Sequence, residues 1–199
     1  MSTFIHTFPK EFYQLDALTL SRHLLGQVLS HTTERGTTTG YIIETEAYMG
    51  GTDRASHAFG GVPTERTQVL YTGSGTAYVF MIYGMHYLFN VSCGPPNDPQ
   101  CVLVRALEPL TGIEIMTSRR QTDERIKLTN GPGKLTQAMG INDAHYGLDL
   151  VDSNLKILQG RFVPDSLIVR GERINVDYAG DHALLPWRFW VNGSKYVSR

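Results

Sequence analysis

Acidic and aromatic side chains alternate with smaller ones in a segment that reads as a β-strand. Residues 41–49 have the sequence Tyr-Ile-Ile-Glu-Thr-Glu-Ala-Tyr-Met, and β-branched residues followed by strict alternation predict a strand. Because successive side chains of a strand point to opposite faces, we expect Glu44, Glu46 and Tyr48 on one face. Residues two apart on a face lie roughly 7 Å from each other, so a carboxylate and an aromatic ring could act on one bound ligand. The alternative is a solvated edge, since buried carboxylates are uncommon.

A second segment places aromatic rings and an amide on an apolar hairpin that we expect over residues 77–91. Tyr83 precedes Gly84 at the predicted bend, so its ring would stand clear of the sheet. For the aromatic residues of this hairpin, ordinary core packing is the alternative. For Asn90, the alternative is a cap at the end of a strand.

Cationic side chains occupy two positions where a negatively charged partner is expected. Arg105 lies in the apolar run 101–107, where an unpaired cation is unfavourable, so it should face a carboxylate or a phosphate. Residues 130–134 read Asn-Gly-Pro-Gly-Lys, which predicts a helix start with Pro132 in the first turn. The free amides of that turn and Lys134 could bind a phosphate, and a plain helix cap is the alternative.

These segments, together with residues 105–109, 130–135 and 188–194, resemble the alkyladenine DNA glycosylase family, also called the 3-methyladenine DNA glycosylases of the mammalian type. The resemblance spans most of the chain, and several ordered blocks form a specific signal where one block would be weak. It implies a monofunctional DNA glycosylase that hydrolyses the N-glycosidic bond of alkylated, 3-methyladenine-like purines flipped out of duplex DNA. Deaminated purines are a further substrate class, and the reaction would initiate base excision repair without a cofactor or a metal.

Two other functions stay open at this point. A damaged-base recognition protein without catalytic activity would keep the aromatic residues but would not need Glu46. A hydrolase of free modified nucleosides would share the pocket chemistry but would not need a residue that enters the duplex.

The resemblance also implies roles for residues of the pocket. Glu46 matches a general base that takes a proton from the water attacking the sugar C1′, and we assign Arg105 to positioning the nucleotide backbone or that water. The residues expected to stack on the extruded base or to select it are Tyr48, His57, Phe80 and Asn90, of which Asn90 would exclude guanine by a clash with its amino group.

A second set of residues is expected to contact the DNA. The ring of Tyr83 matches a wedge that fills the gap left by the flipped nucleotide, with Met85 beside it. Phosphate contacts are expected from a Gly- and Pro-rich loop and from the predicted helix start, at Thr64, Arg66, Gly131, Gly133 and Lys134.

Length and composition favour one glycosylase domain over residues 1–199, with 41% hydrophobic and 19% charged residues. We expect an α/β (α+β) fold, in which a single compact domain has a curved, mostly antiparallel sheet, flanking helices and a protruding β-hairpin. This shape is taken partly from the family. The predicted helices cover residues 16–25, 112–119 and 134–139, and the predicted strands cover residues 27–31, 38–49, 102–107, 167–174 and 187–191.

The net charge of −1 and the pI near 6.6 are not the basic balance typical of DNA-binding proteins. Basic residues outnumber acidic ones only after residue 118, so we expect more of the phosphate contacts there and a modest, salt-sensitive affinity for undamaged duplex. Cys93 and Cys101 do not form a paired metal-ligand pattern. Without a membrane span or a signal peptide, we expect a cytoplasmic, nucleoid-associated bacterial monomer whose partner is damaged double-stranded DNA.

Overall fold

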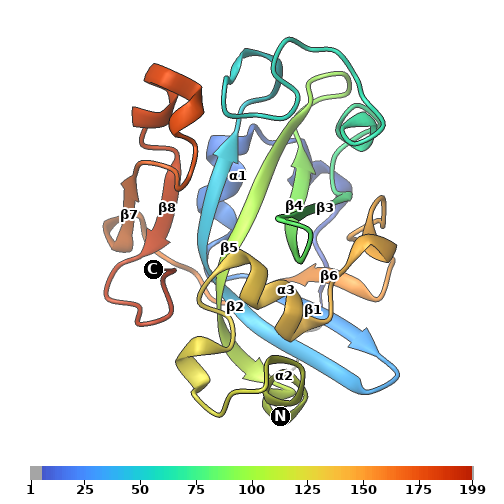
Figure 1. Cartoon of the computed structure of the whole chain (residues 1–199), viewed down its shortest axis with the longest axis vertical. Coiled ribbons are helices and arrows are strands. Elements are labelled where there is room, and N and C mark those ends of the chain that lie inside the picture. Colours follow the sequence, from blue (N-terminus) through green and yellow to red (C-terminus); the bar gives the residue numbers. More distant parts are fainter. Residues whose placement is uncertain (1–5, 199) are drawn as a thin grey trace.

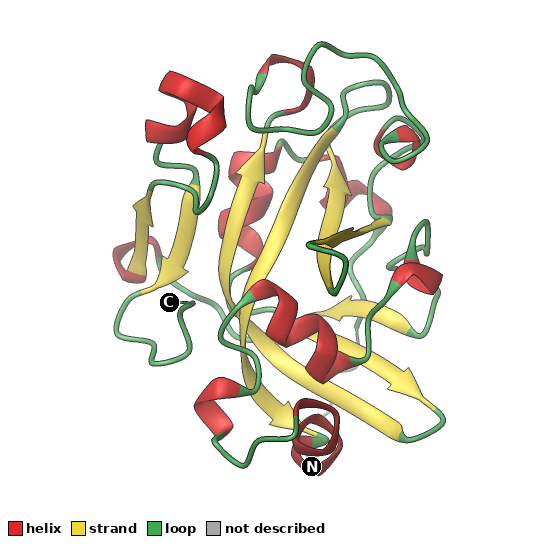
Figure 2. Cartoon of the chain, viewed as in Figure 1, coloured by secondary structure: helices red, strands yellow, loops and turns green. Residues whose placement is uncertain are grey.

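The computed structural model describes residues 6–198, and these residues form one eight-stranded sheet with helices on both of its faces (Figures 1 and 2). The main path of the sheet runs β3-β4-β5-β2-β1-β6, and every pairing is antiparallel. The strands of this path are β1 (Val28–Thr33), β2 (Gly36–Tyr48), β3 (Ala77–Ile82), β4 (His86–Cys93), β5 (Gln100–Thr111) and β6 (Leu155–Leu158). The expected fold class is therefore confirmed.

The long strand β2 organises the rest of the sheet. One of its edges pairs with β5 along most of its length. The other edge is shared, because β1 pairs with its first half and β8 (Arg188–Val191) pairs with Glu44–Glu46 in its second half. The last strand, β7 (Ile168–Gly171), pairs only with β8. A late segment of the chain is thereby placed beside the acidic residues of β2.

The helix α1 (Ala17–Leu24) covers the face of β2 opposite to these acidic residues. Asp16 caps it, since its carboxylate accepts from the backbone N–H groups of Leu18 and Thr19. The hydroxyl of Thr45 donates to the carbonyl of Ser21 in the helix, at 2.9 Å. The alternation expected along β2 is thus confirmed, because Thr45 faces the helix and its neighbours Glu44 and Glu46 face away.

Pairing between β2 and β5 is irregular at the acidic residues. Glu44 pairs with Ala106, whereas Ile42 pairs with Leu107 and Thr45 pairs with Val104. Ile43 and Arg105 therefore have no directly opposite partner in this ladder. Ile43 is the extra residue on β2, and Arg105 is the extra residue on β5. Such bulges bend a strand and change the direction of a side chain, and here they lie where Arg105 meets the carboxylates of β2.

The remaining helices are short. These are α2 (Ile113–Arg120), α3 (Pro132–Met139) and seven 3₁₀ segments, η1 (Lys10–Gln14), η2 (Gly50–Thr52), η3 (Gln68–Leu70), η4 (Arg125–Lys127), η5 (Asp143–His145), η6 (Asp165–Leu167) and η7 (Asp177–Leu184), within the described residues. As predicted, α3 has Pro132 in its first turn and ends at Gly140, whose φ of 74° is left-handed.

The structure corrects some of the predicted bounds. β5 is longer than residues 102–107, and the short strand β6 was not predicted. The strand predicted over residues 167–174 ends at Gly171. Beyond that residue the chain leaves the sheet, because Arg173 and Ile174 hydrogen-bond to residues in and just after β2.

Two histidines in contact, His31 of β1 and His145 of η5, lead us to predict that the stability of the fold falls in acid. The Nδ1 of buried His31 lies 2.8 Å from the carbonyl of Met139, so it carries the proton, and its Nε2 accepts from the Nε2 of His145 at 3.0 Å. Burial, the first cause, lowers the pKa of both rings. In the unfolded chain each histidine takes up a proton near its ordinary pKa of about 6.5, whereas in the folded chain it does so only at lower pH. The free energy of unfolding therefore has its full value above that pH and declines below it. The decline is at most ~1.4 kcal/mol per pH unit for each histidine.

Urea unfolding at pH 8 and pH 5 measures this decline. The His145→Gln variant should show a smaller difference between the two pH values than the wild type. If the free energy of unfolding fell equally in both proteins between these pH values, the His31–His145 pair would not be the source of the decline.

Candidate active site

A cavity of about 740 Å³ opens on the face of the sheet opposite to α1. Its wall comes from the β3–β4 hairpin, the start of α3, the loop after β2 and the segment between β7 and η7. Most of the residues predicted for the site line it, namely Tyr48, His57, Phe80, Tyr83, Asn90, Arg105, Gly131, Gly133 and Lys134. This volume lies within the ~300–1,000 Å³ that is usual for small-molecule sites in proteins, so the cavity has room for a nucleobase.

Glu46 lies directly behind this wall and is fully buried. Its Oε2 accepts from the hydroxyl of Tyr48 at 2.8 Å, and its Oε1 accepts from the backbone N–H of Ile174 at 2.9 Å. The guanidinium of Arg105 lies 3.1 Å from the same Oε1. All three contacts are donors, which suits a charged carboxylate. All three donors also line the cavity, so Glu46 is one hydrogen bond away from it.

Glu44 has a different environment, although it carries the same group on the same face. Its two oxygens accept from Arg105 Nε at 3.1 Å, Arg188 Nη1 at 3.1 Å, and the hydroxyl and backbone N–H of Ser198 at 2.8 and 2.6 Å. It therefore ties two strands and the segment at Ser198 together. The solvated-edge alternative is excluded for both carboxylates, and Arg105 faces carboxylates, as one of its two predicted options.

The phenol of Tyr48 is held in its protonated form. Burial, followed by the negative charge of Glu46, raises its pKa well above the ordinary value. The hydroxyl therefore acts as the donor to Glu46, while the ring borders the cavity.

Aromatic rings form the opposite part of the wall. The centroid of His57 lies 4.6 Å from that of Phe80, and its Nδ1 lies 2.7 Å from the hydroxyl of Tyr78. Burial, and then the charge of Arg66, lowers the pKa of His57. The amide nitrogen of Asn90 donates to the carbonyl of Tyr78 at 3.1 Å, so its position is fixed from the strand next to it. The predicted stacking residues are therefore brought together at one cavity.

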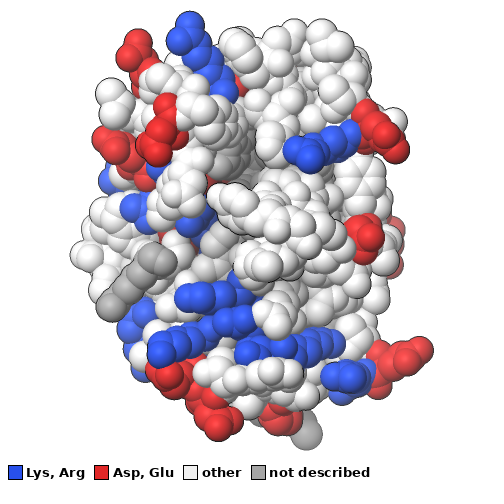
Figure 3. Space-filling view, in the orientation of Figure 1, with Lys and Arg blue, Asp and Glu red and all other residues white. Residues whose placement is uncertain are grey.

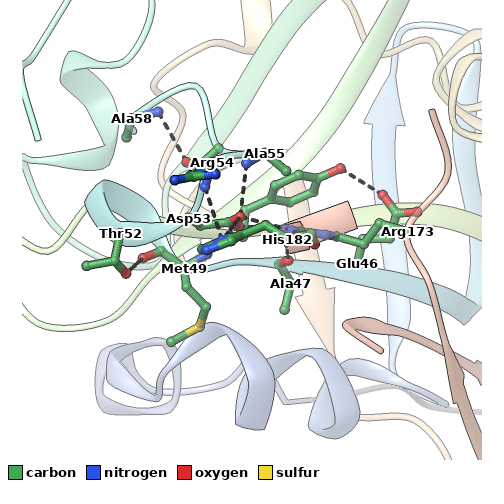
Figure 4. A network of polar contacts seen from close by, with 12 residues as sticks. Glu46, Ala47, Met49, Thr52, Asp53, Arg54, Ala55, Ala58, Arg173 and His182 are labelled. Carbon is green, nitrogen blue, oxygen red and sulfur yellow. Dashed lines mark hydrogen bonds and ion pairs between the residues drawn. The ribbon is translucent and has the colours of Figure 1, made fainter. Parts of the chain in front are cut away.

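A buried ion pair that was not predicted joins Asp53 and Arg173 (Figure 4), and its guanidinium lies over the ring of Tyr48. The guanidinium of Arg173 binds both oxygens of Asp53 and also donates to the carbonyls of Ala47 and His182. Both charged side chains are fully buried. The residues are 120 positions apart in the chain, and neither belongs to a pattern that would have joined them in the sequence.

The residues predicted to contact DNA lie at or beyond the rim. Tyr83 and Met85, at the tip of the β3–β4 hairpin, are 79% and 69% exposed, so the expected protrusion is confirmed. Arg66 lies over the ring of Phe80, at 5.9 Å, and the hydroxyl of Thr64 contacts that of Thr67. Met85, Thr64 and Arg66 do not line the cavity itself.

Basic side chains gather below the cavity in the view of Figure 3, over α2, α3 and the segment between them. Lys134 lies in the first turn of α3, with its ammonium 3.0 Å from the side-chain oxygen of Asn130. At Gly133, a Cβ would come within 3.1 Å of the side chain of His86, so the start of the helix lies close against the β3–β4 hairpin. The other basic residues of this surface are Arg119, Arg120, Arg125 and Lys127.

Within residues 6–198, no group of three or more histidine, cysteine or acidic side chains is arranged to hold a metal ion. The described helices also include none with the length and apolar character needed to cross a membrane.

Comparison with known proteins matches residues 11–195 to the family model of the methylpurine-DNA glycosylases. A protein of Oceanobacillus iheyensis is 45% identical over 96% of this chain and 94% of its own length. Relatives from Bacillus licheniformis (44% identical, 96% of each chain) and Desulfitobacterium hafniense (43% identical, 95% of this chain and 97% of the relative) are similar. The names of all three designate 3-methyladenine DNA glycosylases.

Proposed function

This chain belongs to the methylpurine-DNA glycosylase family, and on that premise we propose how its cavity removes a damaged purine. The protein is a DNA glycosylase of alkylated-base repair, and its substrate is DNA. The finer proposal is that the cavity receives a 3-methyladenine-like purine flipped out of duplex DNA, with deaminated purines as a further class. The enzyme would act as a cytoplasmic, nucleoid-associated monomer, with residues 1–199 as one catalytic domain.

Glu46 is the proposed general base. A water molecule between its carboxylate and the sugar C1′ gives a proton to Glu46 while its oxygen forms the new bond to C1′. The C1′–N bond breaks, and its electron pair neutralises the positive charge of the alkylated purine, which therefore leaves without an acid. Arg105 holds Glu46 and the water in position, and the charge of Glu46 stabilises the oxocarbenium-like sugar.

The remaining residues would bind the base and the duplex. Tyr48 stacks on one side of the purine, and His57 and Phe80 stack on the other, with about 1–3 kcal/mol for each aromatic contact. Asn90 excludes guanine. Tyr83 enters the duplex with Met85 beside it, and the phosphates are contacted by Thr64, Arg66, Gly131, Gly133 and Lys134.

The observation that carries this proposal is the set of three hydrogen-bond donors that hold Glu46, each of which also lines the cavity. Glu44 differs in this respect, because it also binds Arg188, which does not line the cavity.

Product analysis of the wild-type protein tests the proposal. Alkylated duplex DNA should release free 3-methyladenine and leave intact strands with abasic sites, while the same lesion in a free nucleoside should turn over far more slowly. Binding of the damaged duplex without release would favour the recognition protein. Equal turnover of nucleoside and duplex would favour the nucleoside hydrolase.

A further inference from the structure

The ring of Tyr48 lies between the cavity and a buried cation. The ring borders the cavity, and the guanidinium carbon of Arg173 lies over it, 4.9 Å from its centroid. The same carbon is 4.9 Å from the ring of Trp187, so the cation is enclosed by aromatic side chains. Because the side chain of Arg173 is fully buried, solvent does not screen its charge.

Such a cation conflicts with the proposed substrate. A purine methylated at a ring nitrogen carries a positive charge, and it is attracted by the negative π-face of a tyrosine. A second cation on the far face of the ring would repel it through the low dielectric of the protein. Without compensation, Arg173 would make Tyr48 a poor platform for the lesion that the enzyme removes.

Asp53 supplies the compensation. Its two oxygens bind the two terminal nitrogens of Arg173, at 2.5 and 2.9 Å. Burial opposes the charged form of Asp53, but the hydrogen bonds and charge of Arg173, together with the N–H groups of Ala55 and Met49, outweigh burial and lower its pKa. The pair is therefore ionic but has no net charge.

The same pair also fixes two of the three donors that hold Glu46. Arg173 packs against Tyr48, whose hydroxyl binds Oε2, and it precedes Ile174, whose N–H binds Oε1. Asp53 accepts from the N–H of Ala55 at 3.0 Å, in the loop that carries His57. The arginine is thus needed to position Tyr48 and Ile174, and an acidic partner is needed to cancel the charge of the arginine.

We propose that Asp53 neutralises Arg173 so that Tyr48 can stack on a positively charged purine, which makes this pair a determinant of specificity for cationic over neutral lesions. The inference rests on the proposed function of the cavity and names the charge of the base that it prefers. Neither residue touches the substrate, since both act through Tyr48.

Two matched duplexes test the inference by binding alone. One carries 3-methyladenine on a 2′-fluorinated sugar, which is cationic and resists hydrolysis, and the other carries 3-deaza-3-methyladenine, its neutral isostere. In the Asp53→Asn variant, affinity for the cationic duplex should fall on the order of tenfold, while affinity for the neutral duplex changes by less than about twofold. The double variant Asp53→Asn/Arg173→Met, which removes both charges, should return the ratio of the two affinities to that of the wild type.

The matched control is Asp181→Asn, the same change at an exposed position of η7. It should shift both affinities equally. The inference would be overturned if Asp53→Asn changed the affinities for the cationic and the neutral duplex equally. It would also be overturned if the double variant did not restore the wild-type ratio of these two affinities. If Asp53→Asn does not fold, Arg173→Met tests the same charge balance. Burial then protonates an Asp53 that has lost its cation, so the site stays neutral and the ratio of the two affinities should remain that of the wild type. A fall in the preference for the cationic duplex would be contrary.

Failure of the proposed function gives a different result. In that case the wild type would either bind neither lesion duplex better than an undamaged one, or bind the lesion without releasing free base from alkylated duplex. A wild type that prefers both lesions, with the same ratio in every variant, would reject only the role of Asp53 and Arg173.

Discussion

Replacing Glu46 by Gln should lower the rate of 3-methyladenine release from alkylated duplex by about 10²–10⁴-fold, the usual contribution of general acid–base catalysis. Glutamine has nearly the same size, and its one oxygen can still accept from Ile174 while its amide group donates to the hydroxyl of Tyr48, but it cannot take a proton from water. It also removes the negative charge that stabilises the sugar in the transition state. Single-turnover release of the free base from a duplex of defined sequence measures the effect.

Binding and folding must be followed beside the rate. Affinity for the damaged duplex should stay within a few-fold of the wild type, because Glu46 lies behind the wall that contacts the base. The control Glu108→Gln makes the same change on β5, where Glu108 pairs with Arg161 at the surface, and it should leave release unchanged. A Glu46→Gln variant that folds and retains activity would remove Glu46 from its assigned role.

Replacing Tyr83 by Ala should lower release from duplex DNA by roughly 10–100-fold, with little effect on a single-stranded oligonucleotide carrying the same lesion. The ring compensates for stacking lost when the nucleotide leaves the duplex, and a base–aromatic contact contributes about 1–3 kcal/mol. A single strand has no duplex to open, so it gains little from the wedge. Parallel rate measurements on the two substrates separate this role from one in the pocket.

The free energy of unfolding should not change in this variant, because Tyr83 is 79% exposed. Phe162→Ala removes an aromatic ring that is 87% exposed and lies in a different part of the surface, and it should leave both rates unchanged. Equal losses of Tyr83→Ala on duplex and single strand would contradict the wedge.

Local pattern was enough to predict the main parts of the fold. Alternation along β2 placed Glu44, Glu46 and Tyr48 on one face, because a strand has only two faces to choose from. Asp16 and Pro132 marked the starts of α1 and α3, because caps act within one turn. The family resemblance added roles for these residues that spacing alone did not give.

The missing parts depend on contacts between distant segments. The ion pair of Asp53 and Arg173 joins a loop to a segment 120 positions later, and neither residue stands in a periodic pattern. Ser198, which binds Glu44, was missed for the same reason. The irregular pairing at Ile43 and Arg105 was also invisible, since each strand reads as a regular one and only their register reveals the two extra residues.

The distance in the chain between the parts of the site also matters for biosynthesis. The strand that carries Glu46 emerges from the ribosome long before Arg173 and Ile174 are translated, and domains tend to fold as they emerge. A nascent chain therefore has Glu46 and Tyr48 without the N–H group and the guanidinium that orient them. Synthesis itself would keep the unfinished enzyme from attacking DNA.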